Sequence, residues 1–199
     1  ADPSSASFFV ALAVLLGGSE LLLKDVLVNP TRDGFFRKLQ EMGADIYYEN
    51  LREISGEPVA DVCVRHRGRL NGVEVKPEEV PSMIDELPVL AVVMALSEGS
   101  SRVRGAEELR VKESDRIRAI VENLRAMGVR VEEFEDGFEL EGVESLKGAK
   151  VKTYGDHRIA MAFSVAGLLA EGETLIDDPG CVAVSYPDFY KDLDYILIR

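Results

Sequence analysis

The sequence contains no tryptophan, only two cysteines and only two histidines among its 199 residues. The cysteines, Cys63 and Cys181, lie far apart, form no CxxC motif and have no histidine cluster beside them. A disulfide framework or a zinc site would need closer, patterned spacing of these residue types. The scarcity therefore argues against a metal site and indicates reduced thiols in a cytoplasmic protein.

Long apolar runs and a positive net charge are also missing. The longest apolar stretch, residues 8–16, is about half of the roughly 20 residues that a membrane span needs, and no basic segment precedes it. The formal net charge of −13 repels nucleic-acid phosphates. We therefore expect neither a membrane nor a nucleic acid as a partner, and any bound anion must be held by a local cluster of arginine and lysine.

Apolar residues make up 46% of the chain and charged residues 30%, which is too apolar for disorder and too charged for a membrane protein. A length of 199 residues suits one domain with a sizeable core, so we expect a single domain over residues 1–199. The chain begins at Ala1 rather than methionine, directly in a helix-capping sequence. We therefore expect it to be a piece of a longer protein.

A unit of helix, strand, helix and strand recurs along the chain. Ser4 and Ser5 could cap the first apolar helix, and Lys24-Asp25 interrupts the strand that follows it. The predicted ranges are 4–16, 21–28, 31–42 and 45–48 in the first copy, 87–96, 101–104, 113–127 and 129–134 in the second, and 159–169, 173–176 and 187–193 in the third, where residues 195–198 are the candidate for the last strand.

Matching landmarks support the repeat, because Met42-Gly43 and Met127-Gly128 end corresponding helices. Between the copies, stretches 61–75 and 137–152 predict hairpin-like short strands. One unit is too small to bury its own apolar helix, so three units should close around three shared helices. We predict an α/β (α+β) domain with pseudo-threefold symmetry, helices inside and sheets outside. An irregular α/β fold with chance matches is the alternative.

The densest chemical motif is RVKESDR, over residues 110–116, at the start of the second amphipathic helix. Backbone amides at a helix start favour anions there. On one helix face, Glu113 and Arg116 would direct a carboxylate and a guanidinium at one ligand. The alternative is a solvated charged first turn, in which Asp115 and Arg118 form an ordinary surface pair.

Two further helix starts carry ionisable residues. Asp156 can cap the third apolar helix, and His157 and Arg158 begin it, although the rest of that helix is apolar. Asp85 and Glu86 precede the second apolar helix, where Asp85 could be a binding group or simply a cap. In a threefold domain these starts gather at one end with that of the first apolar helix, which predicts an anion site there.

Two other charged residues have less informative surroundings. His66 lies in a polar stretch with alternating residues, which favours an exposed hairpin. Arg32 begins the first amphipathic helix without the carboxylate that accompanies Arg116, so a surface role is favoured.

The motifs at residues 108–116 and 155–161 together resemble the C-terminal half of the 5-enolpyruvylshikimate-3-phosphate synthase family. Ordered agreement from residues 2–7 through 84–88 to 185–189 extends the resemblance over nearly the whole chain. It implies one domain of an inverted α/β barrel, built from three βαβαββ-type units around parallel central helices. It also implies that residues 1–199 are the C-terminal domain and that the N-terminal domain is absent.

The resemblance implies transfer of the enolpyruvyl group of phosphoenolpyruvate to the 5-hydroxyl of shikimate 3-phosphate, with release of phosphate. The reaction serves aromatic amino-acid (chorismate) biosynthesis in the cytoplasm, proceeds through a tetrahedral intermediate and needs no metal or organic cofactor. The implied partners are the two substrates and the chain's own N-terminal domain, which carries most of the shikimate phosphate site. We therefore expect the isolated chain to fold without turning over.

The resemblance also assigns roles to individual residues. Asp85 would bind the 5-hydroxyl or take its proton, and Glu113 would exchange a proton with the methylene carbon of phosphoenolpyruvate. Lys112 would contact the shikimate phosphate near its hydroxyls and the moving proton. The family's two guanidinium groups that clamp phosphoenolpyruvate would be Arg116 and Arg158.

Two positions qualify this assignment. His157 is expected to orient the neighbouring arginine or to lie near the leaving phosphate. Some family members carry a lysine where this chain has Val184, so a third cation is either missing or comes from elsewhere.

Two other functions remain as alternatives. The related UDP-N-acetylglucosamine enolpyruvyl transferases share the fold and the phosphoenolpyruvate chemistry, but their expected motifs differ from KESDR and GDHR. A non-catalytic binding module is the alternative from another class.

Overall fold

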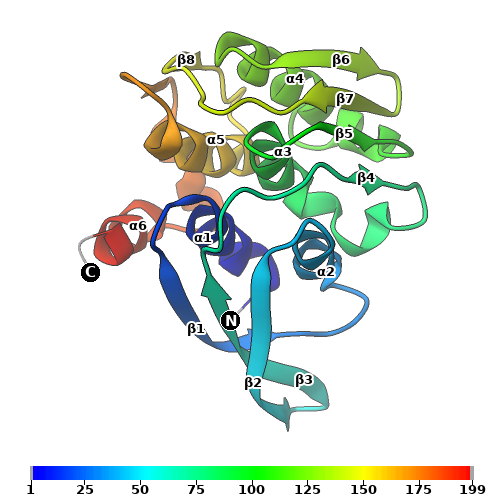
Figure 1. Ribbon diagram of the computed structural model, residues 1–199, viewed down its shortest axis with the longest axis vertical. Coiled ribbons are helices and arrows are strands. Elements are labelled where there is room, and N and C mark those ends of the chain that lie inside the picture. The colour runs from blue at the N-terminus through cyan, green and yellow to red at the C-terminus, as the bar shows by residue number, and fades with distance from the viewer. Residues whose placement is uncertain (1, 198–199) are drawn as a thin grey trace.

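A computed structural model describes residues 2–197 (Figure 1). In chain order the helices are α1 (Pro3–Leu15), α2 (Gly34–Glu41), α3 (Leu87–Ala95), α4 (Arg116–Ala126), α5 (His157–Leu169) and α6 (Phe189–Leu197). The strands are β1 (Glu20–Leu27), β2 (Asp45–Ile54), β3 (Glu57–Arg65), β4 (Glu74–Val75), β5 (Ser100–Val103), β6 (Arg130–Phe134), β7 (Gly137–Glu141), β8 (Lys150–Val151) and β9 (Leu175–Ile176). Short 3-10 helices span Val80–Ser82, Ile84–Glu86, Glu107–Val111 and Pro179–Val184.

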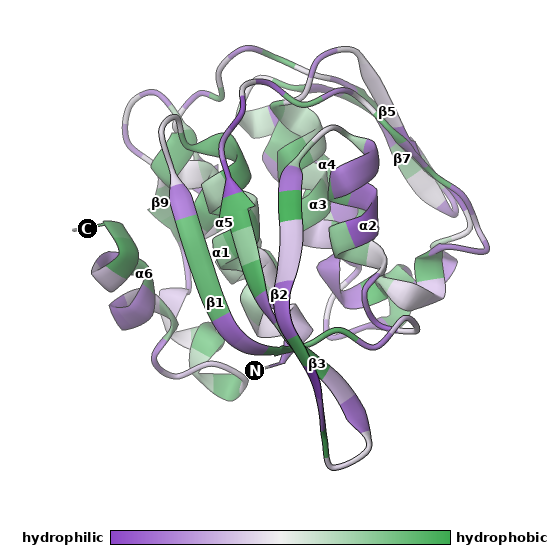
Figure 2. Ribbon diagram, turned by 60° about the horizontal axis from the view of Figure 1, so that its bottom comes forward, coloured by the Kyte–Doolittle hydropathy of each residue, from purple (hydrophilic) through white to green (hydrophobic). Residues whose placement is uncertain are grey.

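Helices α1, α3 and α5 form the centre of the domain and pack against one another. Apolar residues dominate all three, and every residue of α3 is buried. A helix that is apolar all round belongs inside a core. Figure 2 shows these largely hydrophobic helices behind strands β1, β3 and β2. The prediction of an α/β domain with three shared inner helices is confirmed.

None of the helices in residues 2–197 combines the length and hydrophobicity that a membrane span requires.

The three inner helices begin at the same end of the domain. Ser4, in the first turn of α1, donates a hydrogen bond to Glu86, the residue immediately before α3. Arg116 donates to Asp85 beside the start of α3 and also to Asp156, the residue that caps α5. These bonds bring the three starts together, so the inner helices run parallel.

Each inner helix packs against a sheet of its own repeat. Strands β1, β3 and β2 form an antiparallel sheet in that order against α1. The sheet β4-β5-β7-β6 lies against α3 and is parallel only between β4 and β5. In the third repeat, β9 packs on α5 and pairs with β8 in parallel. Strands β4 and β8 each reach from one repeat into the sheet of the next and thereby join the copies.

The methionine-glycine landmarks occupy equivalent places in the first two repeats. The carbonyl oxygen of Met42 accepts a hydrogen bond from Asn71 N at 2.9 Å, and that of Met127 accepts one from Lys147 N, also at 2.9 Å. The glycine after each methionine has a positive φ, 99° at Gly43 and 90° at Gly128, which ends the helix in a left-handed conformation. The repeat read from the sequence is therefore present in the backbone bonding.

Several element boundaries differ from the prediction because side chains bond to nearby backbone. Asp2, rather than Ser4 or Ser5, caps α1, since its carboxylate accepts from Ser5 N at 2.9 Å. The first outer helix starts at Gly34 instead of residue 31, because the Asn29 side chain accepts from Thr31 N and forms a turn. Strand β1 runs through Lys24 and Asp25 as one strand with a bulge there.

The first hairpin lies earlier than predicted. It joins β2 and β3 through the turn Ser55-Gly56, so only the second part of β3, residues 61–65, falls within the predicted stretch 61–75. His66 follows β3 and is half-buried, with Nδ1 3.0 Å from the carbonyl oxygen of Val14 at the end of α1. The prediction of an exposed hairpin histidine is therefore wrong, because the end of an inner helix packs beside it.

The third repeat ends in a helix. Residues 195–197 belong to α6, which contradicts a strand there, and Ile198 lies outside the described residues. Phe189 anchors α6, because its ring contacts Phe8 and Phe9 of α1 at centroid distances of 5.7 and 6.0 Å. This aromatic contact closes the core beside α1.

Candidate active site

Arg116 lies at the centre of the gathered helix starts. It is the first residue of α4 and is only 1% exposed, so the alternative of a solvated charged turn is wrong for this side chain. The helix begins here rather than at residue 113 because Asp115 caps it, accepting from Arg118 N at 3.0 Å. The carboxylate of Asp115 also pairs with Arg110 at 2.9 Å, and the side chain of Arg118 pairs with Glu122 instead.

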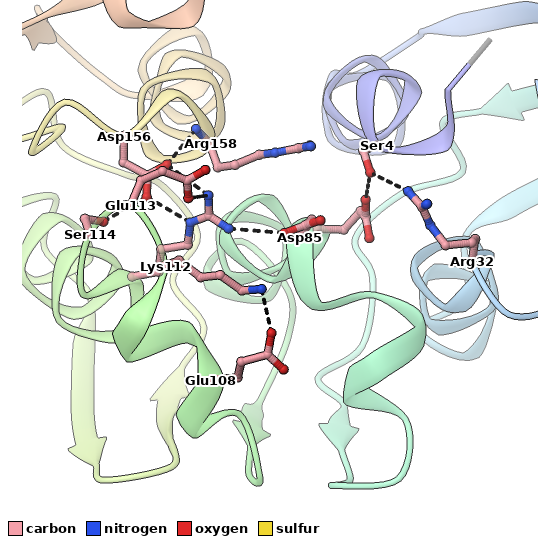
Figure 3. A network of polar contacts seen from close by, with 11 residues as sticks. Ser4, Arg32, Asp85, Glu108, Lys112, Glu113, Ser114, Asp156 and Arg158 are labelled. Carbon is pink, nitrogen blue, oxygen red and sulfur yellow. Dashed lines mark hydrogen bonds and ion pairs between the residues drawn. The ribbon is translucent and has the colours of Figure 1, made fainter. Parts of the chain in front are cut away.

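Three carboxylates bind the guanidinium of Arg116, and Figure 3 labels them as Asp85, Glu113 and Asp156. Nε lies 2.9 Å from Asp156 Oδ2, Nη1 lies 3.2 Å from Asp85 Oδ1, and Nη2 lies 2.5 Å from Glu113 Oε2. A buried guanidinium needs such partners, because burial removes the water that would otherwise solvate its charge. Arg116 therefore brings together both carboxylates predicted from the sequence, Asp85 and Glu113.

The buried partner, Asp156, joins the two sequence motifs. Its carboxylate accepts hydrogen bonds from Ser114 Oγ and from Arg158 N, both at 2.9 Å, in addition to those from Arg116. Burial alone would raise the pKa of Asp156, but the hydrogen bonds and the charge of Arg116 outweigh it and hold the pKa below its ordinary value. The sequence indicated Asp156 only as a helix cap, and its bond to Arg116 could not be read from the spacing.

The two other carboxylates remain accessible. The side chains of Asp85 and Glu113 are 40% and 53% exposed, whereas that of Arg116 is 2% exposed. Asp85 does not cap α3, since its carboxylate bonds to Arg116 instead. Glu113 precedes α4 rather than lying on its face. The carboxylates are thus held from one side by a rigid buried cation and face outward on the other.

Arg158 and His157 begin α5 next to this group. Figure 3 shows the Arg158 side chain extending from α5 across the helix starts toward Ser4. Within residues 2–197, no hydrogen bond or ion pair engages the guanidinium of Arg158. His157 is 8% exposed, and its burial, together with the charge of Arg158, lowers its pKa. The histidine is therefore mostly neutral at pH 7, while Arg158 is available for an anion.

Lys112 lies beside these residues, between the 3-10 helix Glu107–Val111 and α4 (Figure 3). Its Nζ is 2.6 Å from Glu108 Oε1, and its side chain is 25% exposed. Such a pair, at the protein surface, holds the ammonium weakly. Lys112 can exchange this partner for a ligand anion.

Arg32 lies closer to the site than the sequence indicated, whereas Val184 offers no cation, as its residue type requires. Arg32 approaches the helix starts, because its Nη2 lies 3.4 Å from Ser4 Oγ, and its side chain is half exposed. Val184 ends the 3-10 helix Pro179–Val184 and is 80% exposed, without any polar function to offer.

Comparison with known proteins adds a decisive observation. The family model for EPSP synthase (3-phosphoshikimate 1-carboxyvinyltransferase) matches residues 1–193 of the chain. The chain belongs to the EPSP synthase family.

Individual members of this family are close relatives. The 3-phosphoshikimate 1-carboxyvinyltransferase of Aquifex aeolicus is 61% identical over 193 residues, which cover 97% of this chain and 45% of that protein. The enzyme of Persephonella marina is 57% identical over 197 residues, which cover 99% of this chain and 46% of that protein. Each member matches nearly all of this chain with less than half of its own length.

A solved structure of an EPSP synthase from Acinetobacter baumannii superposes with a TM-score of 0.94 at 40% sequence identity. The alignment covers 98% of this chain and 45% of that one. This agreement confirms the α/β fold expected for a domain of the family. The chain spans about 45% of the length of the proteins it matches.

Proposed function

We propose that residues 1–199 form the C-terminal domain of a two-domain enzyme that transfers the enolpyruvyl group of phosphoenolpyruvate to the 5-hydroxyl of shikimate 3-phosphate. The observation that carries the proposal is the pair of accessible carboxylates, Asp85 and Glu113, bound to one buried guanidinium, Arg116. Family membership supports this reaction, since the relatives bear its name.

The reaction needs one base for the 5-hydroxyl and one group that exchanges a proton with the methylene carbon, and the two carboxylates suit these roles. Asp85 accepts the proton of the attacking 5-hydroxyl as its oxygen bonds to C2 of phosphoenolpyruvate. Glu113 delivers a proton to the methylene carbon, C3, which gives a tetrahedral intermediate with a methyl group. Glu113 then takes a proton back from that methyl group while the C2–O bond to phosphate breaks, and Asp85 passes the hydroxyl proton to the departing phosphate, so both carboxyl groups return to their starting states. The double bond re-forms, and the acceptor carries the enolpyruvyl group.

The wall of the active site that this chain supplies contains three cations, Arg116, Arg158 and Lys112. They bind the anionic groups of the two substrates. Arg158 has a guanidinium without a bonded partner among residues 2–197, so it takes the phosphate or carboxylate of phosphoenolpyruvate. Arg116 also binds phosphoenolpyruvate, because an oxygen of this substrate competes with Glu113 for Nη2 of Arg116. The competition releases the Glu113 carboxylate for proton exchange. Lys112 leaves Glu108 for the shikimate phosphate and hydroxyls.

The charge balance of the site supports a second wall. Three carboxylates surround Arg116, and Glu108 occupies Lys112, so the cations of this wall leave little positive charge free for two multiply charged substrates. We assign the missing cations to the N-terminal domain, which the chain would bind as its partner. The enzyme would act in the cytoplasm without a metal or organic cofactor.

The experiment combines this chain with the separately produced N-terminal domain and measures phosphate release from phosphoenolpyruvate with each of two acceptors. Release with shikimate 3-phosphate, and not with UDP-N-acetylglucosamine, is expected. Release only with the UDP-sugar would assign the chain to the related enolpyruvyl transferases. Absence of release with both acceptors, despite formation of the two-domain complex, would favour a binding module.

A further inference from the structure

A buried carboxyl that the proposed reaction does not use lies beside the active-site arginines. Glu86 is 5% exposed and is the residue immediately before the inner helix α3. A carboxylate at this depth is retained only when other groups compensate its lost hydration.

A chain of hydrogen bonds reaches Glu86 from two other helix starts. Ser4, which is 1% exposed in α1, donates its hydroxyl proton to Glu86 Oε1 and accepts from Arg32 Nη2 at 3.4 Å (Figure 3). The hydroxyl oxygen therefore uses both its donor and its acceptor capacity. Ser4 holds the carboxylate in one orientation, and Arg32 polarises the hydroxyl in the direction that strengthens its donation.

Arg158 completes the surroundings of Glu86. The pKa of Glu86 lies above its ordinary value, because burial outweighs the Ser4 hydrogen bond and the charges of Arg158 and Arg32, which oppose the rise. The neighbouring charge of Asp85 adds to the rise, because two nearby carboxylates repel each other. The two guanidinium groups, which come from different repeats, thus favour the ionised carboxylate.

We infer that Glu86 is a positioning residue for Arg158: its buried charge, fixed by Ser4 and Arg32, holds this guanidinium across the helix starts. The guanidinium of Arg158 makes no hydrogen bond or ion pair within residues 2–197, although the side chain extends in a defined direction toward Ser4. A long side chain without a partner would otherwise sample many rotamers. Coulomb attraction to one buried charge restricts it while its guanidinium donors stay available for a ligand.

The consequence for catalysis rests on the proposed function. A guanidinium that is already directed toward the phosphoenolpyruvate site loses less conformational entropy on binding this substrate than a guanidinium on an unrestrained side chain. Glu86 therefore affects the binding of phosphoenolpyruvate more than the chemical step. Neutralising it should raise KM for phosphoenolpyruvate about tenfold and leave kcat within about twofold in the two-domain enzyme.

The direct test uses the 199-residue chain and the ¹⁵N NMR signal of the Arg158 Nε–Hε group, assigned with Arg158→Lys. Glu86→Gln keeps an acceptor for Ser4 but removes the charge, and it should move the signal toward that of free arginine and speed its hydrogen exchange about tenfold. Ser4→Ala and Arg32→Gln should shift it in the same direction by less. Glu78→Gln, on an exposed acid of the preceding turn, should leave it unchanged.

An unchanged Arg158 signal in a folded Glu86→Gln protein overturns the inference. If that variant does not fold, Ser4→Ala and Arg32→Gln decide, since Arg32 is half exposed and its replacement leaves the core intact. This result is separable from the proposed function. A wild-type two-domain complex without turnover would refute the reaction, whereas the NMR signal would still report whether Glu86 positions Arg158.

Discussion

Arg116 Nε lies 2.9 Å from Asp156 Oδ2, and both side chains are almost fully withdrawn from solvent. This ion pair connects the start of α4 to the start of α5. Its two residues are 40 positions apart in the chain. Because Arg116 also bonds to Asp85 and Glu113, the position of both accessible carboxylates depends on it. The pair is the structural basis of the site.

Removing one partner of this pair should be costly. Asp156→Ala leaves a buried guanidinium without its main counter-charge and should lower the free energy of unfolding by about 3–5 kcal/mol, as measured by urea denaturation. Arg118→Ala is the control on the same helix, because its pair with Glu122 is exposed and should change stability by less than about 1 kcal/mol. Equal effects of the two variants would contradict a dominant role for the buried pair.

The proton-transfer role that we propose for Glu113 predicts a change in rate without a change in fold. In the two-domain enzyme, Glu113→Gln should lower kcat by a factor of about 10²–10⁴, because the amide cannot exchange a proton with the methylene carbon. Thermal unfolding of the isolated variant should stay close to that of the wild type, since the side chain is 53% exposed. Glu107→Gln, on a nearby exposed acid, should retain the wild-type rate, and a wild-type rate for Glu113→Gln would remove that residue from the mechanism.

The burial of His157 predicts a pH effect of defined sign. Its pKa lies below 6.5 in the folded chain, so the unfolded chain binds more protons between the folded pKa and 6.5. The contribution of His157 to stability is therefore complete above pH 6.5 and declines as the pH falls through that window. An NMR titration of the His157 ring should give a midpoint below 6.5. A midpoint at or above 6.5 would contradict the account.

The repeat predicts matched effects at two glycines. A methyl group at Gly72 would lie 2.1 Å from the carbonyl oxygen of Ser100, and one at Gly148 would lie 2.2 Å from that of Glu173. Both Gly72→Ala and Gly148→Ala should destabilise the chain by about 1–3 kcal/mol, because backbone must move to relieve the clash. Gly17→Ala, with nothing within 4 Å, is the control and should be neutral by the same denaturation measurement.

Local signals explain how much of the fold could be predicted from the sequence. The inner helices are apolar throughout and the outer ones are amphipathic, so periodicity located them. Glycines with positive φ, such as Gly43 and Gly128, marked where outer helices end. Other boundaries differed from the prediction because of single side-chain bonds or of packing between distant elements. Asp115 moved the start of α4 by capping it, and residues 195–197 continued a helix that packs on α1 through Phe189.

The candidate site was only partly predictable because its bonds join distant parts of the chain. Composition and motif placed Asp85, Glu113 and Arg158 at helix starts, and the repeat placed the starts that carry Asp85 and Arg158 at one end. No pattern in the sequence could show that Asp156 binds Arg116, or that Ser4 bonds to Glu86 across 82 residues. Those contacts depend on how the three inner helices pack, which the spacing within a single motif does not determine.

The central claim is that this chain supplies one wall of an enolpyruvyl transfer site. The most direct measurement compares phosphate release from phosphoenolpyruvate and shikimate 3-phosphate by the 199-residue chain alone, by the N-terminal domain alone and by their mixture. We predict release by the mixture only, with 5-enolpyruvylshikimate 3-phosphate as the product. Release by this chain alone, or no release by a mixture that has formed a complex, would contradict the claim.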